Sequence, residues 1–438
     1  MKSDKAKVLH AVAGRSMLAH VLASVAAADV TDVAVVIGPG REDVRAEAQK
    51  LAPHSQVFVQ ADRLGTAHAV LAAGSAIGAG YDDLIVLFAD TPLVTGETIR
   101  ALRDALAAGA GVAALGFMAE NPFGYGRLLQ DDSSRLIAIR EEKDASEAER
   151  AIRLCNAGLM AIDGHRALEL LGRIEAQNAK GEYYLTDLVG IAAGAGLPVQ
   201  ARRLEDARQG VGVNTRVHLA EASAILRERI NRQWMLAGVT LVDPATTYIE
   251  PGVTIGQDTV IWPNTLLRGD CVIGAGCELG PNTVLQDTRV GDGCVIIASF
   301  AEKASLEEDV HMGPYARLRP GARLDRGVHM GNFGEVKNSH LGAGVHMGHF
   351  SYIGDAEIGE KVNIGAGTIT CNYDGVKKSR TEIGERAFIG SDTMLVAPVK
   401  IGAGSRTGAG AVVTRDVPDH TLAVGVPARA IRKLEKRD

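Results

Sequence analysis

The sequence has few of the features that mark membrane, exported or nucleic-acid-binding proteins. No run of about 18 apolar residues occurs, and the start, MKSDKAKVLHAVAG, lacks the apolar centre of a signal peptide, so we expect no membrane span and a cytoplasmic protein. The five cysteines show no CxxC spacing, which argues against a zinc site or disulfide framework and predicts small buried thiols. A net charge of −6, from 47 basic and 53 acidic side chains, is too small to indicate a nucleic acid or membrane partner.

Aromatic residues are also scarce, whereas glycine is abundant. Phe, Trp and Tyr number only 8, 2 and 8 among 438 residues, while the chain holds 51 glycines, 28 of them after residue 250. This length predicts two or three domains. The uneven glycine distribution indicates that the C-terminal part has a repeated need for tight turns.

The N-terminal half alternates short apolar runs with amphipathic stretches. VAVVIG (33–38), LIVLFAD (84–90) and GVAALGF (111–117) are typical of buried parallel strands, and 42–52 and 96–109 suit crossover helices. This alternation predicts an α/β, Rossmann-like domain. Ligands bind at the carboxyl ends of strands in such sheets, which makes Asp90 a candidate for chemistry.

The C-terminal half follows a period of six. Aliphatic residues recur every sixth position from Ile255 to Leu285 and again from Ile383 to Ile401, and VHMG occurs at 310, 328 and 345. This period is typical of a left-handed parallel β-helix built from hexapeptide repeats, in which three hexapeptides close one coil of a triangular prism. Between the halves, 216–236 has helical spacing without Gly or Pro. The sequence thus predicts domains at 1–214 and 238–438, joined by a linker helix at 215–237.

This order of domains resembles a known family, the bifunctional bacterial enzymes of UDP-N-acetylglucosamine synthesis. The resemblance covers essentially the whole chain and is most specific in KVLHAVAGRSMLAHVL (7–22), QADRLGTAHAV (60–70), EEKDA (141–145), KGEYYLTDL (180–188), GHFSYIGDAEIG (348–359) and NIGAGTITCNYDG (363–375). It implies acetyl transfer from acetyl-CoA to glucosamine-1-phosphate in the β-helix, then uridylyl transfer from UTP to N-acetylglucosamine-1-phosphate in the N-terminal domain, with release of pyrophosphate.

The resemblance implies the following uridylyl site. Lys7 would contact phosphates, and Asp90 and Asn214 would bind Mg²⁺ through oxygen ligands. Gln60, Gly65 and Thr66 would read the uracil base, and Gly126, Glu141 and Asn156 would surround the sugar. Phe88 and Ala89 complete the UDP-N-acetylglucosamine site. The alternative interpretation, which needs no resemblance, is that Lys7 is a solvated surface charge and that Asp90 caps the end of a strand.

One motif of the family is absent from this sequence. Family members place a glycine-rich loop similar to LAAGxGTRM, which cradles the triphosphate, where this sequence starts at its methionine. A start codon assigned too far downstream explains this more simply than evolved loss. Without this loop, we expect uridylyl transfer to be weakened.

For the acetyl site, the resemblance implies His349 as the catalytic base, a task that suits neutral imidazole. The remaining residues divide between two ligands. The sugar phosphate would be bound by Arg319, Lys337, Tyr352 and Asn363, with Glu335 orienting the site, and acetyl-CoA by Ala366, Asn372, Tyr373, Ser391 and Ala409. The histidines of the VHMG copies, His311, His329 and His346, are expected to stack as repeat residues rather than bind metal.

Flat prism faces and the resemblance together predict a homotrimer with acetyl sites shared between neighbours. The expected partners are small molecules: glucosamine-1-phosphate, acetyl-CoA and UTP. Two other hypotheses stay open at this point. The chain is an acetyltransferase with an inactive nucleotidyltransferase domain, or a non-catalytic sugar-nucleotide-binding subunit.

Overall fold

A computed structural model describes residues 1–178 and 180–433. The chain divides into two compact units, Met1–Leu226 and Arg227–Asp438. The division falls inside α9 (Arg216–Leu236), which lies within one residue at each end of the linker helix expected at 215–237. No helix in the described ranges has the length and apolar character that crossing a membrane requires.

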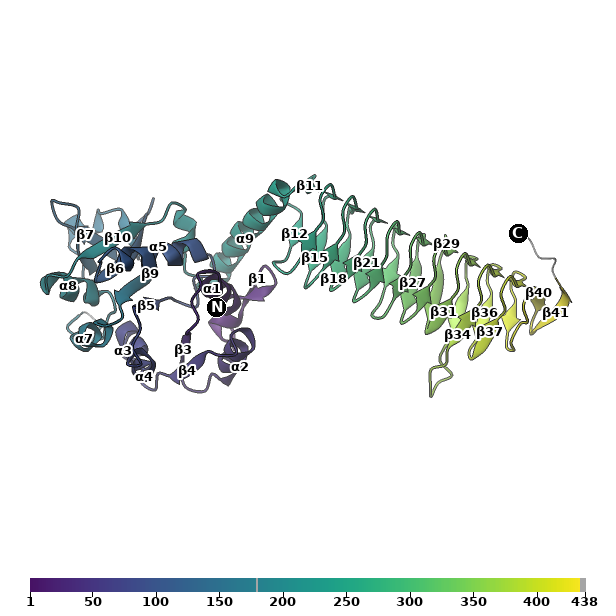
Figure 1. Cartoon of the computed structure of the whole chain (residues 1–438), viewed down its shortest axis with the longest axis horizontal. Helices are drawn as coiled ribbons and strands as arrows, with labels where there is room; N and C mark the ends of the chain where they lie inside the picture. Colours follow the sequence, from purple (N-terminus) through teal and green to yellow (C-terminus); the bar gives the residue numbers. More distant parts are fainter. Residues whose placement is uncertain (179, 434–438) are drawn as a thin grey trace. The chain divides into compact units, whose positions relative to one another are not determined.

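The first unit is built on a mixed sheet with helices on both faces (Figure 1). Its strands run in the order β10 (Val199–Arg203), β6 (Val112–Met118), β9 (Leu154–Asp163), β7 (Arg127–Gln130) and β8 (Leu136–Arg140). Alternate residues of β6 face opposite cores. Val112 and Ala114 pack with α8 (Asp187–Gly194), while Ala113 and Leu115 pack with α5 (Gly96–Ala107). The N-terminus of α5 is capped by the Thr95 hydroxyl, which accepts a hydrogen bond from the Thr98 amide.

The strands of this unit depart from the predicted parallel arrangement. β5 (Asp83–Val86) and β6 do not pair with each other, because both pair antiparallel with β9. In the described residues, β3 (Ala34–Ile37) pairs only with β4 (Gln56–Val59), as a separate parallel pair. Both β3 and β5 are largely half-buried instead of buried. Both segments are therefore less buried than expected, and the expected parallel pairing holds for β3 but not for β5, which pairs antiparallel with β9.

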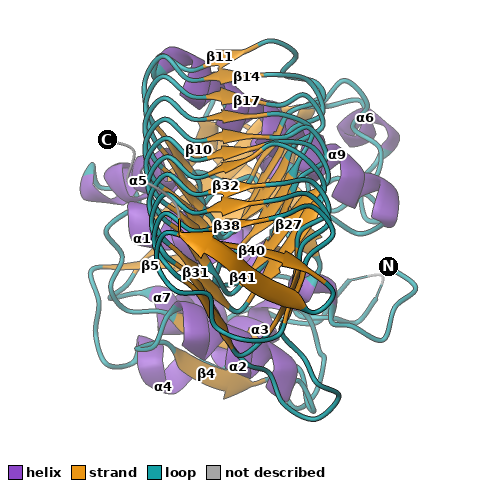
Figure 2. Ribbon diagram, turned by 90° about the vertical axis from the view of Figure 1, so that its right-hand side faces the viewer, coloured by secondary structure: helices purple, strands orange, loops and turns teal. Residues whose placement is uncertain are grey.

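The second unit is the predicted β-helix. Its coils stack into three sheets of parallel strands, which we call face 1, face 2 and face 3. Face 1 runs from β11 (Thr240–Leu241) to β40 and is closed by β41, face 2 runs from β12 (Tyr248–Ile249) to β39 (Val412–Val413), and face 3 runs from β13 (Thr254–Ile255) to β37 (Val399–Ile401). Figure 2 shows face 1 as one column of short strands, with β41 (Ala428–Lys433) crossing its end antiparallel to β40 (Thr421–Gly425). We call the turns that lead from face 1 to face 2 corner 1–2, and the turns that lead from face 2 to face 3 corner 2–3.

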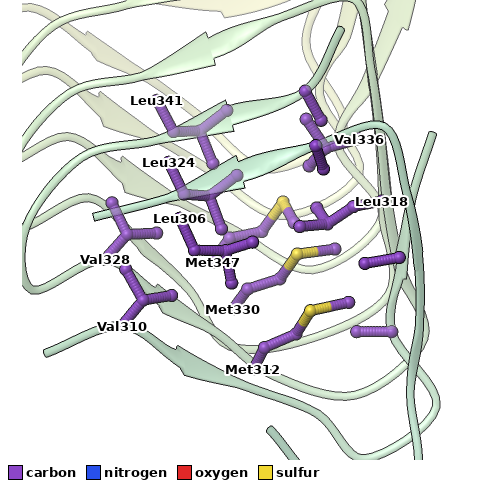
Figure 3. Packing of buried hydrophobic residues seen from close by; sticks show 14 of the residues in the cluster. Leu306, Val310, Met312, Leu318, Leu324, Val328, Met330, Val336, Leu341 and Met347 are labelled. Atoms are coloured by element: carbon purple, nitrogen blue, oxygen red, sulfur yellow. The ribbon is translucent and has the colours of Figure 1, made fainter. Parts of the chain in front are cut away.

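The repeat explains how the prism is filled. The Val and Met of each VHMG copy point inward, with Met312, Met330 and Met347 at most 2% exposed, and Figure 3 shows these methionines stacked along the core. Thin, flexible or branched aliphatic side chains fill the narrow interior, where large aromatic rings would not fit. Four of the five cysteines are buried, and Cys371 is half-buried.

One coil is longer than its neighbours. Residues paired between adjacent strands are usually 16 to 18 positions apart, as in Val260↔Glu278 and Val284↔Phe300, but Ile369 pairs with Met394. The extra residues form a segment at 372–380 that leaves corner 2–3 and projects from the stack (Figure 1). A hydrogen bond from the Ser379 amide to the Asn372 carbonyl closes this projecting segment at its base.

Candidate active sites in the two units

In the first unit, three residues predicted to contact phosphate and metal meet at one point. Lys7 Nζ donates hydrogen bonds to Asp90 Oδ2 at 2.5 Å and to Asn214 Oδ1 at 2.9 Å. The backbone holds the two acceptors together, because the Val213 amide donates to the Asp90 carbonyl. One carboxylate and one amide oxygen converging on a cationic group is a donor set that fits a hard divalent cation, whose remaining ligands are waters and phosphates.

The residues predicted to read the base lie beside a second loop. Gln60 Nε2 donates to the Gly65 carbonyl at 3.1 Å, and Thr66 Oγ1 accepts from the Leu185 amide at 2.9 Å. Gly65 has a φ of 123°, and a Cβ there would lie 2.7 Å from the amide nitrogen of Tyr183. Only glycine allows the two backbones to come this close.

The residues predicted around the sugar also come together. The Asn156 amide donates to the Gly126 carbonyl at 2.8 Å, and a Cβ on Gly126 would lie 3.5 Å from Glu141 Oε1. Burial raises the pKa of the Glu141 carboxyl, which accepts a hydrogen bond from the Thr186 hydroxyl at 3.1 Å. Thr186 was not among the predicted residues. Its only sequence signal is its place in the stretch KGEYYLTDL. Because Thr186 follows Leu185, which is bonded to Thr66, it connects the residues predicted to read the base with Gly126, Glu141 and Asn156, which we call the sugar group.

Phe88 and Ala89 connect these groups. The Phe88 ring packs against Gly158, whose amide donates to Asn156 Oδ1 at 3.0 Å. Ala89 lines a hollow of about 220 Å³ together with Lys7. The eleven residues predicted for this site thus form small groups of contacts in the first unit, and residues adjacent in the sequence, such as Leu185–Thr186 and Phe88–Asp90, connect these groups.

In the second unit, the residues predicted to bind the sugar phosphate lie on neighbouring coils. Lys337 and Tyr352 belong to face 2, and Arg319 directly follows the face-2 strand β24 (Arg317–Leu318). Arg319 Nη1 donates to Glu335 Oε1 at 3.0 Å. Glu335 pairs with Tyr352 in the ladder between β27 (Gly334–Lys337) and β30 (Ser351–Gly354). Asn363 lies on face 1, next to His346.

Residues predicted for catalysis and acetyl-CoA form a row along corner 1–2. His349 is exposed, and it is the second residue after the face-1 strand β29 (His346–Met347). Ala366, Ser391 and Ala409 occupy this same repeat position on the next three coils, after β32 (Asn363–Ile364), β35 (Phe388–Ile389) and β38 (Arg406–Thr407). A row of small side chains leaves room for a long, extended ligand, and the base at one end of the row would lie beside one end of that ligand.

Two predicted acetyl-CoA residues are not part of this row. Asn372 and Tyr373 lie at corner 2–3, where the projecting segment begins, so face 2 separates them from Ala366 and Ser391. Asn372 Nδ2 donates to Asp355 Oδ2 at 2.5 Å, and Tyr373 Oη donates to the Gly375 carbonyl. One chain therefore does not bring all the predicted acetyl-CoA residues together.

The repeat histidines lie one above another, and two of them stack as predicted. The rings of His329 and His346 lie 4.5 Å apart at 11°, whereas those of His311 and His329 lie 6.3 Å apart and are tilted by 33°. Burial and the neighbouring imidazoles lower the pKa of His329. In the described ranges, no group of three or more His, Cys, Asp or Glu side chains is arranged to hold a metal.

Comparisons with known proteins agree with both halves of this description. A family model for the MobA-like NTP transferase domain matches residues 1–153, and one for the bacterial transferase hexapeptide (six repeats) matches 252–286 and 380–415. A protein of Xanthobacter autotrophicus named "Bifunctional protein GlmU" is 52% identical over 99% of this chain and 93% of its own length. The chain belongs to the GlmU family.

Other GlmU proteins are similar over the same extent. The Bradyrhizobium protein is 52% identical over 97% of this chain and 91% of its own length, and the Streptomyces avermitilis protein is 45% identical over 97% and 89%. Among solved structures, an Arabidopsis UDP-N-acetylglucosamine acyltransferase covers 43% of this chain and 73% of its own, at 17% identity and a TM-score of 0.38. The family assignment therefore rests on the sequence relatives.

Proposed function

We propose that the two units divide the reactions of this bifunctional enzyme between them. The β-helix, assigned to 238–438, transfers acetyl from acetyl-CoA to glucosamine-1-phosphate. The α/β domain, assigned to 1–214, transfers uridylyl from UTP to N-acetylglucosamine-1-phosphate and releases pyrophosphate, and 215–237 links the two. The observation that carries this assignment is that each unit gathers its own group of predicted residues: Lys7, Asp90 and Asn214 meet in the first unit, and Arg319 and Glu335 are bonded in the second.

In the acetyl transfer, His349 is the general base. The sugar amine attacks the thioester carbonyl carbon, His349 takes a proton from that amine, and the carbon–sulfur bond breaks so that CoA leaves as its thiol after protonation. Arg319 and Lys337 hold the sugar phosphate through a guanidinium fork and an ammonium point charge. The Lys337 ammonium lowers the pKa of Lys378, and a bound phosphate would relieve this repulsion.

The acetyl site is completed by a second copy of the chain in a homotrimer. His349 and the row Ala366, Ser391 and Ala409 lie on corner 1–2, whereas Asn372 and Tyr373 lie on corner 2–3. A neighbour related by a threefold axis would bring its corner 2–3 to this chain's corner 1–2. The projecting segment at 372–380, with Tyr373 59% exposed and Val376 91% exposed, is the part suited to reach across.

Mixing two variants tests this shared site. His349→Ala and Tyr373→Ala are each expected to abolish or strongly reduce release of CoA thiol. In trimers reassembled from equal amounts of both, about a quarter of the sites would combine an intact His349 with an intact neighbouring Tyr373. Recovery of about that fraction of the wild-type rate supports sharing. No recovery, with mixed trimers demonstrated by mass, would contradict it.

In the uridylyl transfer, the chain acts by positioning and charge neutralisation. Asp90 and Asn214 would hold Mg²⁺, which neutralises phosphate charge when bound. Lys7 binds the phosphates, while Gln60 and Thr66 place the base. Gly126, Glu141 and Asn156 hold the sugar, so that its phosphate oxygen attacks the α-phosphorus of UTP in line with the departing pyrophosphate.

We place the protein in the cytoplasm, where acetyl-CoA and UTP are available and thiols stay reduced. Assaying thiol release and pyrophosphate release separately on the full chain tests the proposed function. Release of both supports the two-activity assignment. Thiol release alone would reduce the chain to an acetyltransferase, and the absence of both products would remove the enzymatic assignment.

A further inference from the structure

Arg127 is an arginine with an unusual environment, because its side chain is only 1% exposed. It begins β7, directly after Gly126. Its Nη2 donates to Glu142 Oε2 at 2.6 Å and to the Arg150 carbonyl at 3.2 Å, and its Nη1 donates to the Tyr125 carbonyl. One buried guanidinium therefore ties the start of β7 and the preceding Tyr125 to Glu142 and Arg150, which lie 15 and 23 positions further along the chain.

Glu142, the partner of Arg127, also accepts a hydrogen bond from the backbone. Glu142 Oε2 accepts from the Gly124 amide at 3.3 Å, and Oε1 lies 3.9 Å from Arg150 Nε. The hydrogen bond from Arg127 lowers the pKa of the Glu142 carboxyl, so the group stays ionised. Together, Arg127 and Glu142 hold the loop at 121–126 from both sides.

Each member of this ion pair follows a residue of the sugar group in the sequence. Gly126 precedes Arg127, and Glu141 precedes Glu142. The strands β7 and β8 pair Arg127 with Arg140, so the two sugar-group residues leave the same end of one antiparallel hairpin. The distance between Gly126 and Glu141 is therefore set where the ion pair closes this hairpin end.

The pair is a poor device for stability alone. Burying a guanidinium costs free energy that its ion pair only partly offsets, and replacing a buried pair by apolar groups is often neutral or stabilising. Here Arg127 is buried, whereas the Glu142 side chain stays 21% exposed. In addition, Arg127 Nε is buried without a hydrogen-bond partner in the described part of the chain. The hydrogen bonds from this pair to the backbone of Gly124, Tyr125 and Arg150 suit a role in fixing local geometry more than a role in stability.

We propose that the Arg127–Glu142 ion pair is a positioning device that sets the width of the sugar pocket and thereby the affinity for N-acetylglucosamine-1-phosphate. The inference rests on the proposed uridylyl function. Neither residue touches the reacting atoms, so both act through Gly126, Glu141 and the loop at 121–126.

Three variants test the proposal in the full-length protein. Glu142→Gln keeps the shape of the side chain but leaves Arg127 without a counter-charge, which also lowers stability. The double variant Arg127→Met with Glu142→Gln removes both charges and is expected to recover the wild-type melting temperature. Asp131→Asn is the matched control, since it breaks the ion pair between Asp131 and Arg135 at the opposite end of the same hairpin.

For both Glu142→Gln and the double variant, we expect the KM for N-acetylglucosamine-1-phosphate to rise about tenfold or more, because a pocket displaced by a fraction of an ångström loses its hydrogen bonds. The KM for UTP and the rate of thiol release should stay within about twofold of wild type. Asp131→Asn should leave all three values unchanged. A double variant that recovers both stability and the wild-type KM for the sugar phosphate would overturn the proposal, since the pair would then be purely structural.

Failure of the proposed function gives a different result. If the wild-type chain releases no pyrophosphate, uridylyl transfer itself is refuted. Titration calorimetry with N-acetylglucosamine-1-phosphate then measures the same pocket without turnover. Weaker binding by the double variant than by Asp131→Asn supports the positioning role, and equal binding refutes it.

Discussion

Gly354 provides a test of how closely the acetyl site is packed. It ends β30 on face 2, and it is buried beside two predicted ligand-binding residues. A Cβ at this position would lie 2.7 Å from Tyr352 Cζ and 2.8 Å from Asn372 Nδ2. Since Gly354 is not among the glycines with positive φ, alanine fits the backbone, and the whole effect of Gly354→Ala falls on these two side chains.

The size of the effect follows from the contact distances. Tyr352 Oη is the atom nearest to the added Cβ, and because ordinary contacts of a Cβ begin near 3.4 Å, Cζ alone has to move by at least about 0.7 Å. A displacement of about 1 Å in a positioned group costs about 100-fold in rate. We therefore expect kcat/KM for acetyl transfer to fall about 10- to 100-fold, or about 1.4 to 2.7 kcal/mol of transition-state stabilisation.

Thiol release under varied glucosamine-1-phosphate is the assay, and Gly348→Ala is the control. A Cβ on Gly348 meets nothing closer than His346 Nε2 at 3.6 Å, so this variant should keep the wild-type rate although it lies on the same coil. Pyrophosphate release should be unchanged in both variants. If Gly354→Ala keeps kcat/KM within about twofold of wild type, the Tyr352 hydroxyl does not contact the sugar, and the reasoning is refuted.

Two further outcomes concern stability and the uridylyl site. Burial alone would lower the pKa of His340, but hydrogen bonds to Glu357 at 2.5 Å and Asp325 at 2.7 Å raise it above the ordinary 6.5. The charged histidine therefore stabilises the fold fully below pH 6.5, and this contribution is lost as pH rises through the raised pKa. Urea unfolding from pH 6 to pH 9 should show the decline in wild type and a smaller one in His340→Gln; equal declines would exclude the histidine as its source. Gly65→Ala would strain a φ of 123° and place a Cβ 2.7 Å from the Tyr183 amide nitrogen. We therefore expect the free energy of unfolding to fall by about 1 to 3 kcal/mol and the KM for UTP to rise. An unchanged KM for UTP would show that Gly65 does not help to bind the base.

The period of the sequence was sufficient to predict the β-helix. A residue repeated every six positions must face the interior of a three-sided coil, which is why Met312, Met330 and Met347 are buried and the histidines before them stack outside. The linker helix was equally predictable, because Arg216–Leu236 contains no residue that breaks a helix.

The N-terminal sheet was predicted less well. Apolar runs identified β5 and β6 as strands, but a run of apolar residues does not indicate which strand it will pair with or in which direction. β9 lies antiparallel to both because it arrives from a distant part of the chain, and no local pattern encodes this direction. The Arg127–Glu142 pair was missed for a related reason. Charged residues in a strand look like a solvated face until the fold buries them.

The division of the acetyl site was likewise hidden. The resemblance placed Ala366 and Asn372 in one ligand site, and they are only six positions apart in the sequence. In the β-helix those six positions cross face 2 from one corner to the next, which separates the two residues within one chain.

The most direct test of the account is a paired measurement of both products on wild type, His349→Ala and Asp90→Asn. The account predicts that wild type releases both products. His349→Ala should lose thiol release by about 100-fold or more while keeping pyrophosphate release, and Asp90→Asn should show the reverse. Loss of both products in either variant, or thiol release that survives in His349→Ala, would contradict the claim that the chain carries two separate sites with these residues at their centres.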